Sequence, residues 1–288
     1  LSTDPVDGLC SGSQYGAMPD WDVSQVTRMG GGTFYNKTVF NADISDWDVS
    51  NVTSMNGMFN GASSFNQDLN SWDVSIVTDM ANMFYNASSF NQDLNSWDVS
   101  NVNNMLYMFR NASVFNGNIS SWDVSNVNDM HSMFNYASAF NQPLNNWDVS
   151  NVTRMRGMFW DATAFNANIS SWDTRSVTSM YAMFTSAISF NQPLNNWDVS
   201  NVTDMEVMFL GAISFNQDIN NWDVSNVITM NRMFYNARVF NQPLNNWNVS
   251  SVIETRQMFR GASAFNQPLN NWDVKNVTDM SKMFYYAT

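Results

Sequence analysis

The sequence predicts an α/β repeat solenoid of about eleven 25-residue coils, each a short parallel β-strand followed by a short helix. Two observations predict this fold. A tryptophan recurs every 25 residues along nearly the whole chain, and within each unit the spacing of the apolar residues changes from two to three and four. The regular tryptophans are Trp47, Trp72, Trp97, Trp122, Trp147, Trp172, Trp197, Trp222, Trp247 and Trp272, preceded by Trp21 at a spacing of 26.

Each element follows from the pattern inside one unit, for which residues 197–221 are close to the consensus. With the tryptophan as position 0, the apolar residues at positions 0 and 2 flank an aspartate, which indicates a short strand. Val202, Met205 and Met208 then fall at spacings of three, on one face of a short helix. Thr203 and Asp204 suit the start of that helix, and the remaining positions return the chain to the next strand.

Stacking of the units accounts for the recurring apolar residues. One unit alone cannot bury its Trp, Val, Met and Phe, whereas stacked coils form a continuous core. We therefore interpret these columns as core, and we keep an exposed tryptophan platform for carbohydrate as the alternative. Whether the solenoid is straight or curved does not follow from the sequence.

The domain organisation follows the repeat. Residues 21–288 form a single solenoid domain whose last repeat is incomplete, and residues 1–20, rich in Pro and Gly, are expected to be an N-terminal cap or linking segment. The final unit still matches the consensus, which indicates a longer solenoid or an end that packs on another molecule. Cys10 is the single cysteine, so no disulfide within the chain is expected.

Composition and charge exclude several classes of protein. Hydrophobic residues make up 44% of the chain, which argues against disorder. The net charge of −13 argues against nucleic acid and anionic membrane surfaces as partners, because both are bound by clustered Lys and Arg. No apolar stretch approaches the roughly 20 residues that a membrane helix needs, so no membrane insertion is expected.

Two polar columns accompany the core. The asparagines at position 19 are predicted to form a buried structural ladder without a ligand, because an amide both donates and accepts hydrogen bonds. The aspartates at position 1 are predicted to close turns by accepting backbone N–H bonds, and a calcium site on Asp73, Asp98 and Asp123 is the weaker alternative. The ladder comprises Asn66, Asn91, Asn116, Asn141, Asn166, Asn191, Asn216, Asn241 and Asn266.

No catalytic constellation is found, so no catalytic residue, metal or cofactor is expected. His131 is the single histidine, which excludes the usual histidine triads and histidine-rich metal sites, and we expect its side chain to be exposed. Phosphate-binding and dinucleotide-binding glycine loops are absent from the sequence. The recurring aspartates arise from repetition, whereas an acid and a base need different environments.

Sequons for N-linked glycosylation are frequent. Since Asn and Thr are also consensus residues of the repeat, these sequons either carry N-linked glycans or are by-products of the repeat. The candidates are Asn36, Asn51, Asn86, Asn111, Asn118, Asn151, Asn168, Asn201, Asn248 and Asn276.

The unit W-D-V-S-N-V-T-x-M-x-x-M-F-x-x-A-x-x-F-N-Q resembles the surface-protein repeat of the BspA-like group, a relative of leucine-rich repeats. The resemblance covers residues 21–288. It implies a leucine-rich-repeat-like fold and an extracellular or cell-surface protein concerned with adhesion or surface architecture, with no catalytic residues. The departures are few: Thr174 and Arg175 replace Val-Ser, Thr255 replaces Met, and Trp160 lies off the register.

Three hypotheses about function follow. The first is an extracellular structural scaffold or filament subunit, glycosylated and self-associating end to end. The second is a cell-surface adhesin that binds a glycan or a host surface protein through one solenoid face. We expect such binding where the repeat deviates, around Trp160 and residues 154–175, and we keep the arginines of the variable positions as a patch for an acidic partner. A weaker third hypothesis is ice or mineral binding by the regular Asp or Thr columns.

Overall fold

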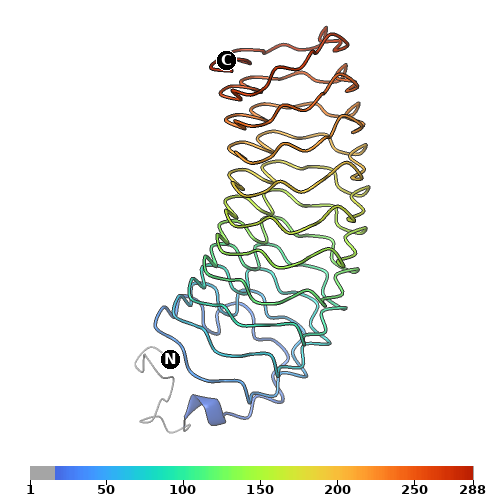
Figure 1. The fold of residues 1–288 in the computed structure, drawn as a ribbon. Coiled ribbons are helices and arrows are strands. Elements are labelled where there is room, and N and C mark those ends of the chain that lie inside the picture. The colour runs from blue at the N-terminus through green and yellow to red at the C-terminus, as the bar shows by residue number, and fades with distance from the viewer. Residues whose placement is uncertain (1–16, 288) are drawn as a thin grey trace.

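The computed structural model describes residues 17–287, which form one continuous stack of coils (Figure 1). The coils follow one another in chain order, and the first and last coils lie at opposite ends of a stack that curves along its length. The tandem unit predicted from the tryptophan spacing is therefore the building block of the fold. Most of the predicted cap at 1–20, including Cys10, lies outside the described residues.

The secondary structure of the coils differs from the prediction. Within residues 17–287 the structure has one short 3-10 helix, η1 (Met18–Asp20), and no α-helix or β-strand. The predicted α/β unit of a strand followed by a helix is therefore wrong. Each coil is a series of reverse turns, and its one sheet-like feature is an isolated parallel bridge at position 7, for example between Asp79 and Asn104. Nothing helical in this range has the length and hydropathy of a membrane span.

The segment from position 8 to position 15 explains why a helix was predicted. Its turns close with hydrogen bonds to the third preceding residue, as from Met83 N–H to the Met80 carbonyl at 3.2 Å. These turns repeatedly return apolar residues to the same side at spacings of three and four. Positions 10 and 14 have positive φ, 58° at Asn82 and 59° at Asn86, which interrupts a helix at each of them.

The amides of this segment bond alternately within a coil and between coils. The N–H groups at positions 8, 10, 12 and 14 point along the stack and donate to carbonyls of the next coil, as from Asn82 to Leu106 at 2.8 Å. The intervening amides at positions 11, 13 and 15 close the turns. The backbone polar groups are thus satisfied without a regular sheet.

The core consists of aromatic and methionine columns that run the length of the stack. Phe84 stacks on Phe90 of its own coil at 4.0 Å and on Phe109 of the next coil at 5.5 Å between ring centroids. The indole N–H of Trp97 donates to the carbonyl of Leu69 at 2.9 Å. From Trp47 to Trp247 the regular tryptophans are buried, so they form no exposed platform for carbohydrate.

The segment before the first coil joins the same core. Met18, in η1, is buried, and its carbonyl accepts the indole N–H of Trp47 at 3.2 Å. In later coils the carbonyl at position 22 accepts this bond. Met18 therefore takes the place that position 22 of a preceding coil would occupy.

Candidate functional site

The aspartates at position 1 close turns in their own coils. Asp98 Oδ1 accepts the Ser100 N–H at 3.0 Å, and Asp73 and Asp123 accept the equivalent amides at the same distance. Hydrogen bonds from the Ser100 hydroxyl, which has the larger effect, and from the Ser100 amide hold the pKa of Asp98 below its usual range. Among residues 17–287 no group of three or more His, Cys, Asp and Glu side chains is arranged to hold a metal, so the calcium alternative gains no support.

The asparagines at position 19 form a ladder along the stack. Asn91 N–H donates to Asn66 Oδ1 at 2.9 Å, and Gln92 Nε2 donates to the carbonyl of the same asparagine at 3.0 Å. The same backbone-to-side-chain bond joins the other coils. These side chains are exposed or half-buried, so the ladder lies at the surface and the predicted burial is wrong.

The sequon asparagines at position 4 support the backbone of the preceding coil. The Nδ2 of Asn151 donates to the Ser125 carbonyl at 2.8 Å, and the same column includes Asn51, Asn201 and Asn276. Asn126, which has no sequon hydroxyl, makes the same bond to Ser100 at 2.7 Å. The asparagine is therefore used by the fold whether or not a sequon is complete.

The other sequon asparagines also occupy turn positions. Asn36, Asn86 and Asn111 have φ of 56°, 59° and 60°, a conformation that asparagine tolerates better than most residues. The side-chain oxygens of Asn118, Asn168 and Asn248 each accept the amide two residues later. The repeat thus provides a structural reason for every sequon, independent of any glycan.

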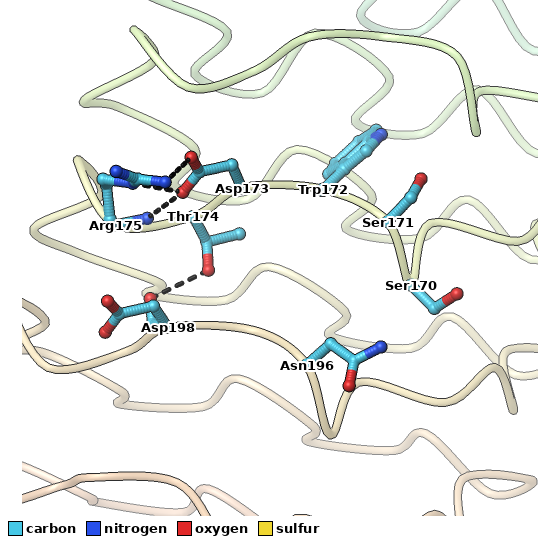
Figure 2. Close-up of a pocket in the computed structure, with 8 residues that line it drawn as sticks. All are labelled: Ser170, Ser171, Trp172, Asp173, Thr174, Arg175, Asn196 and Asp198. Carbon is cyan, nitrogen blue, oxygen red and sulfur yellow. Dashed lines mark hydrogen bonds and ion pairs between the residues drawn. The ribbon is translucent and has the colours of Figure 1, made fainter.

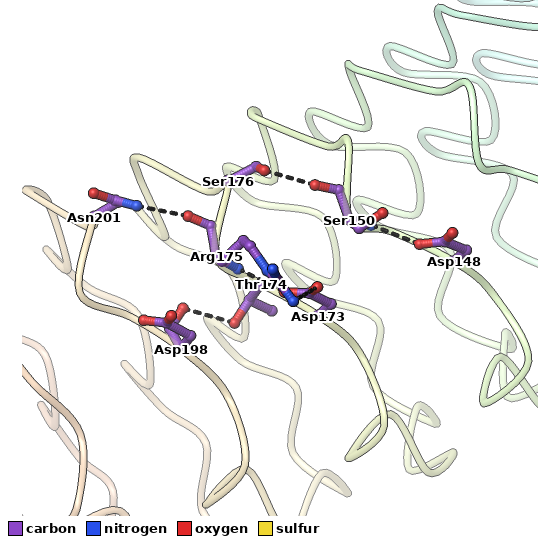
Figure 3. Close-up of polar contacts among 8 residues, drawn as sticks. All are labelled: Asp148, Ser150, Asp173, Thr174, Arg175, Ser176, Asp198 and Asn201. Carbon is purple, nitrogen blue, oxygen red and sulfur yellow. Dashed lines mark hydrogen bonds and ion pairs between the residues drawn. The ribbon is translucent and has the colours of Figure 1, made fainter.

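A hollow of about 450 Å³ lies at the departure from consensus at Thr174 and Arg175 (Figure 2). Arg175 pairs with Asp173 at 2.6 Å, and the Thr174 hydroxyl donates to the carbonyl of Asp198 at 2.8 Å. The neighbouring Ser176 and Asn201 keep their bonds along the stack (Figure 3). The one cationic side chain of this hollow is therefore already neutralised by its own coil.

Charge is distributed unevenly around the coil. Eight of the 12 basic residues and seven of the 25 acidic residues occur at positions 7 to 14, so this segment carries about +1 and the rest of the chain about −14. Tyrosine and tryptophan occur at the same variable positions. We call the side chains at positions 7, 9, 10, 13 and 14 the variable face.

A second hollow, of about 360 Å³, opens on the variable face beside His131. The hydroxyl of Tyr107 lies 3.3 Å from His131 Nε2. His131 is half-buried, so the expectation that its side chain is exposed is wrong. Burial lowers the pKa of His131; the nearby arginines lower it further and the charge of Asp129 opposes the shift. The hollow is lined by Leu106, Asp129, His131, Thr153, Arg154, Arg156, Thr178 and Ser179.

The arginines around this hollow differ in their partners. Arg154 pairs with Asp129 at 3.2 Å, whereas the Arg156 guanidinium lies over the Tyr181 ring at 4.7 Å. Arg110 lies over the rings of Tyr85 and Tyr107, at 5.6 and 5.0 Å, and its buried Nε has no hydrogen-bond partner among the described residues.

Both hollows include residues of the stretch at 154–175, where the sequence predicted binding. Sequence reasoning missed the contributions of Tyr107, Arg110 and Tyr181, which lie outside that stretch. The available signal was the recurrence of Arg and Tyr at positions 9, 10 and 13, which contrasts with the constant residues of the core columns.

Comparison with known proteins identifies the repeat. The profile of the family described as "Mycoplasma protein of unknown function, DUF285" matches residues 10–120, 93–197 and 189–288. The chain belongs to this family. The DUF285 unit in this chain is therefore a coil of turns, stacked through its aromatic columns. No curated protein is similar enough to match this DUF285 chain.

One solved structure resembles the chain weakly. The structure titled "Crystal structure of TLR13-ssRNA13 complex" is 11% identical, with a TM-score of 0.22. The match covers 81% of this chain and 48% of that one, so the chain spans about half its length. A likeness at this level carries no argument about fold or function.

Proposed function

We propose that the chain is a non-catalytic recognition module of an extracellular or cell-surface protein and that it meets its partner through the variable face. The observation that carries the proposal is the segregation of charge: the variable segment is close to neutral while the remainder is strongly acidic. The resemblance of the unit to BspA-like surface repeats supports the location. The partner class is a glycan or a surface protein.

The distribution of constant and variable positions supports the same face. The aromatic and methionine columns, the position-1 aspartates and the position-19 asparagines all have structural partners. Positions 9, 10 and 13 carry Tyr, Arg, His, Leu and Val in different coils. Partly exposed aromatic and arginine side chains are also enriched at binding interfaces.

The experiment compares the native chain with two variants on an immobilised panel of glycans and matrix proteins. The face variant carries Tyr107→Ser, Arg156→Ser and Tyr181→Ser, and the control carries Asp→Asn changes at 123, 148 and 223. We expect the face variant to lose binding at least tenfold and the control to retain it. Equal binding by both variants, or no binding by the native chain, would contradict the proposal.

As a second candidate we propose an end-to-end scaffold, with N-linked glycans on the exposed position-4 asparagines. It is supported by the resemblance of the unit to repeats concerned with surface architecture and by the exposure of Asn51, Asn151, Asn201 and Asn276. Concentration-dependent association in sedimentation velocity is the expected result. A monomer at millimolar concentration would count against this scaffold.

A further inference from the structure

The hollow beside His131 offers a cationic group, Arg156, that forms no direct ion pair, although its charge acts on Glu206. Among the described residues, the ion pairs of this region include Arg154 but not Arg156. The Arg156 guanidinium lies over the face of Tyr181, a contact that leaves the N–H groups at its edge available. A guanidinium edge is suited to two parallel hydrogen bonds with a carboxylate.

The rest of the lining combines one ion pair, between Asp129 and Arg154, with His131 and with neutral groups. Thr153, Thr178 and Ser179 contribute hydroxyls around the hollow, and Leu106 contributes an apolar surface. Such a mixture suits a ligand that has hydroxyls on its edges and C–H groups on its faces. The volume of about 360 Å³ lies within the usual range for small-ligand sites, roughly 300–1,000 Å³.

The backbone beside the hollow favours a sugar over an extended peptide as the ligand. The amides of Met105, Tyr107, Met130 and Ser132 already donate to the next coil, so an extended peptide finds no edge on which to pair.

We propose that this hollow binds the carboxylated sugar unit of an acidic polysaccharide, with Arg156 holding the carboxylate and the hydroxyls of Thr153, Thr178 and Ser179 holding the sugar hydroxyls. The inference rests on the proposed recognition function and names its ligand class. It places the acidic ligand on the segment whose net charge is about +1, whereas the rest of the chain is strongly negative.

The test is calorimetric titration of the native chain with a galacturonate tetramer and with a neutral galactose tetramer. We expect the acidic probe to bind at least tenfold more tightly, and Arg156→Gln to reduce its affinity at least tenfold. Arg256→Gln is the matched control, because Arg256 occupies the same position 9 in another coil. The control is expected to retain native affinity.

Three results would overturn the inference: no binding of the acidic tetramer, equal binding of both tetramers, or equal loss in both variants. If the native chain still binds another component of the glycan and protein panel through its variable face, the recognition function stands and only the ligand class fails. If the native chain binds nothing on that panel, both proposals fail.

Discussion

At the scale of single residues, the coil path depends on the left-handed backbone at positions 10 and 14. Glycine and asparagine take position 14 in most coils, including Gly61, Asn86 and Gly211, because both tolerate positive φ. Val207, at position 10, is the one β-branched residue with positive φ among the described residues, at 52°. A β-branched side chain in this conformation is strained.

Replacing Val207 by asparagine is therefore expected to stabilise the chain by about 1 kcal/mol, since asparagine relieves the strain and is already present at position 10 as Asn82. The measurement is urea unfolding followed by tryptophan fluorescence. Val239→Asn is the control, at an exposed site without positive φ, and it is expected to bring no gain. Equal effects at both sites would refute the role of φ.

The turn-closing aspartates predict a dependence of stability on pH. Hydrogen bonds from the hydroxyl and amide of the serine two residues later lower the pKa of Asp98 and of Asp198. A lowered folded-state pKa means that the stabilisation is complete above the unfolded value, about 3.9, and is lost as pH falls through the folded value. The unfolding midpoint should therefore fall on acidification below about pH 4.

The control for this pH dependence exists in the chain itself. Asn248 closes the same turn by accepting the Ser250 amide at 3.2 Å, without a titrating group. The double variant Asp98→Asn and Asp198→Asn should keep its turns and lose less stability between pH 5 and pH 2. Identical pH profiles for the variant and the native chain would rule out these carboxylates as the cause.

At the scale of the coil, the register of the columns was predictable and the backbone conformation was not. The tryptophan spacing aligned the Asn66 ladder and the Asp98 turns correctly. Spacings of three and four describe a helix and a run of turns equally well, because both return side chains to one side. Similarly, the hollow beside His131 forms between coils, from variable positions that no single unit reveals.

The indole column is expected to dominate the stability of the coil. Trp147 is 3% exposed, stacks on Trp122 at 6.2 Å and donates to the carbonyl of Ile119 at 3.2 Å. Trp147→Ala should therefore lower the free energy of unfolding by about 3–5 kcal/mol. Trp160, off the register and half-buried, is the matched site, and Trp160→Ala should cost about 1 kcal/mol. Equal losses in denaturant titrations would contradict the assignment of the core.

At the scale of the whole molecule, stability comes from contacts between neighbouring coils. Each coil donates its alternate amides to the next coil and stacks its Phe and Trp rings on the same neighbour. No coil contacts more than the coils on its two sides in such a stack, so the energy is a sum of coil and interface terms. The molecule should therefore tolerate the deletion of one whole coil better than the deletion of part of a coil.

Deletion of residues 197–221 tests this, because it joins Asn196 directly to Trp222 and leaves every column in register. The shortened chain should keep the native near-ultraviolet circular dichroism per tryptophan, unfold cooperatively and lose only a modest part of its stability. Deletion of residues 197–216 removes five fewer residues but leaves residues 217–221 as an insertion between Asn196 and Trp222, which breaks the register at that junction. We expect that chain to unfold at lower urea than the chain that lacks residues 197–221. If the two deletions were equally stable, the stacking of in-register columns would not be what holds the fold together.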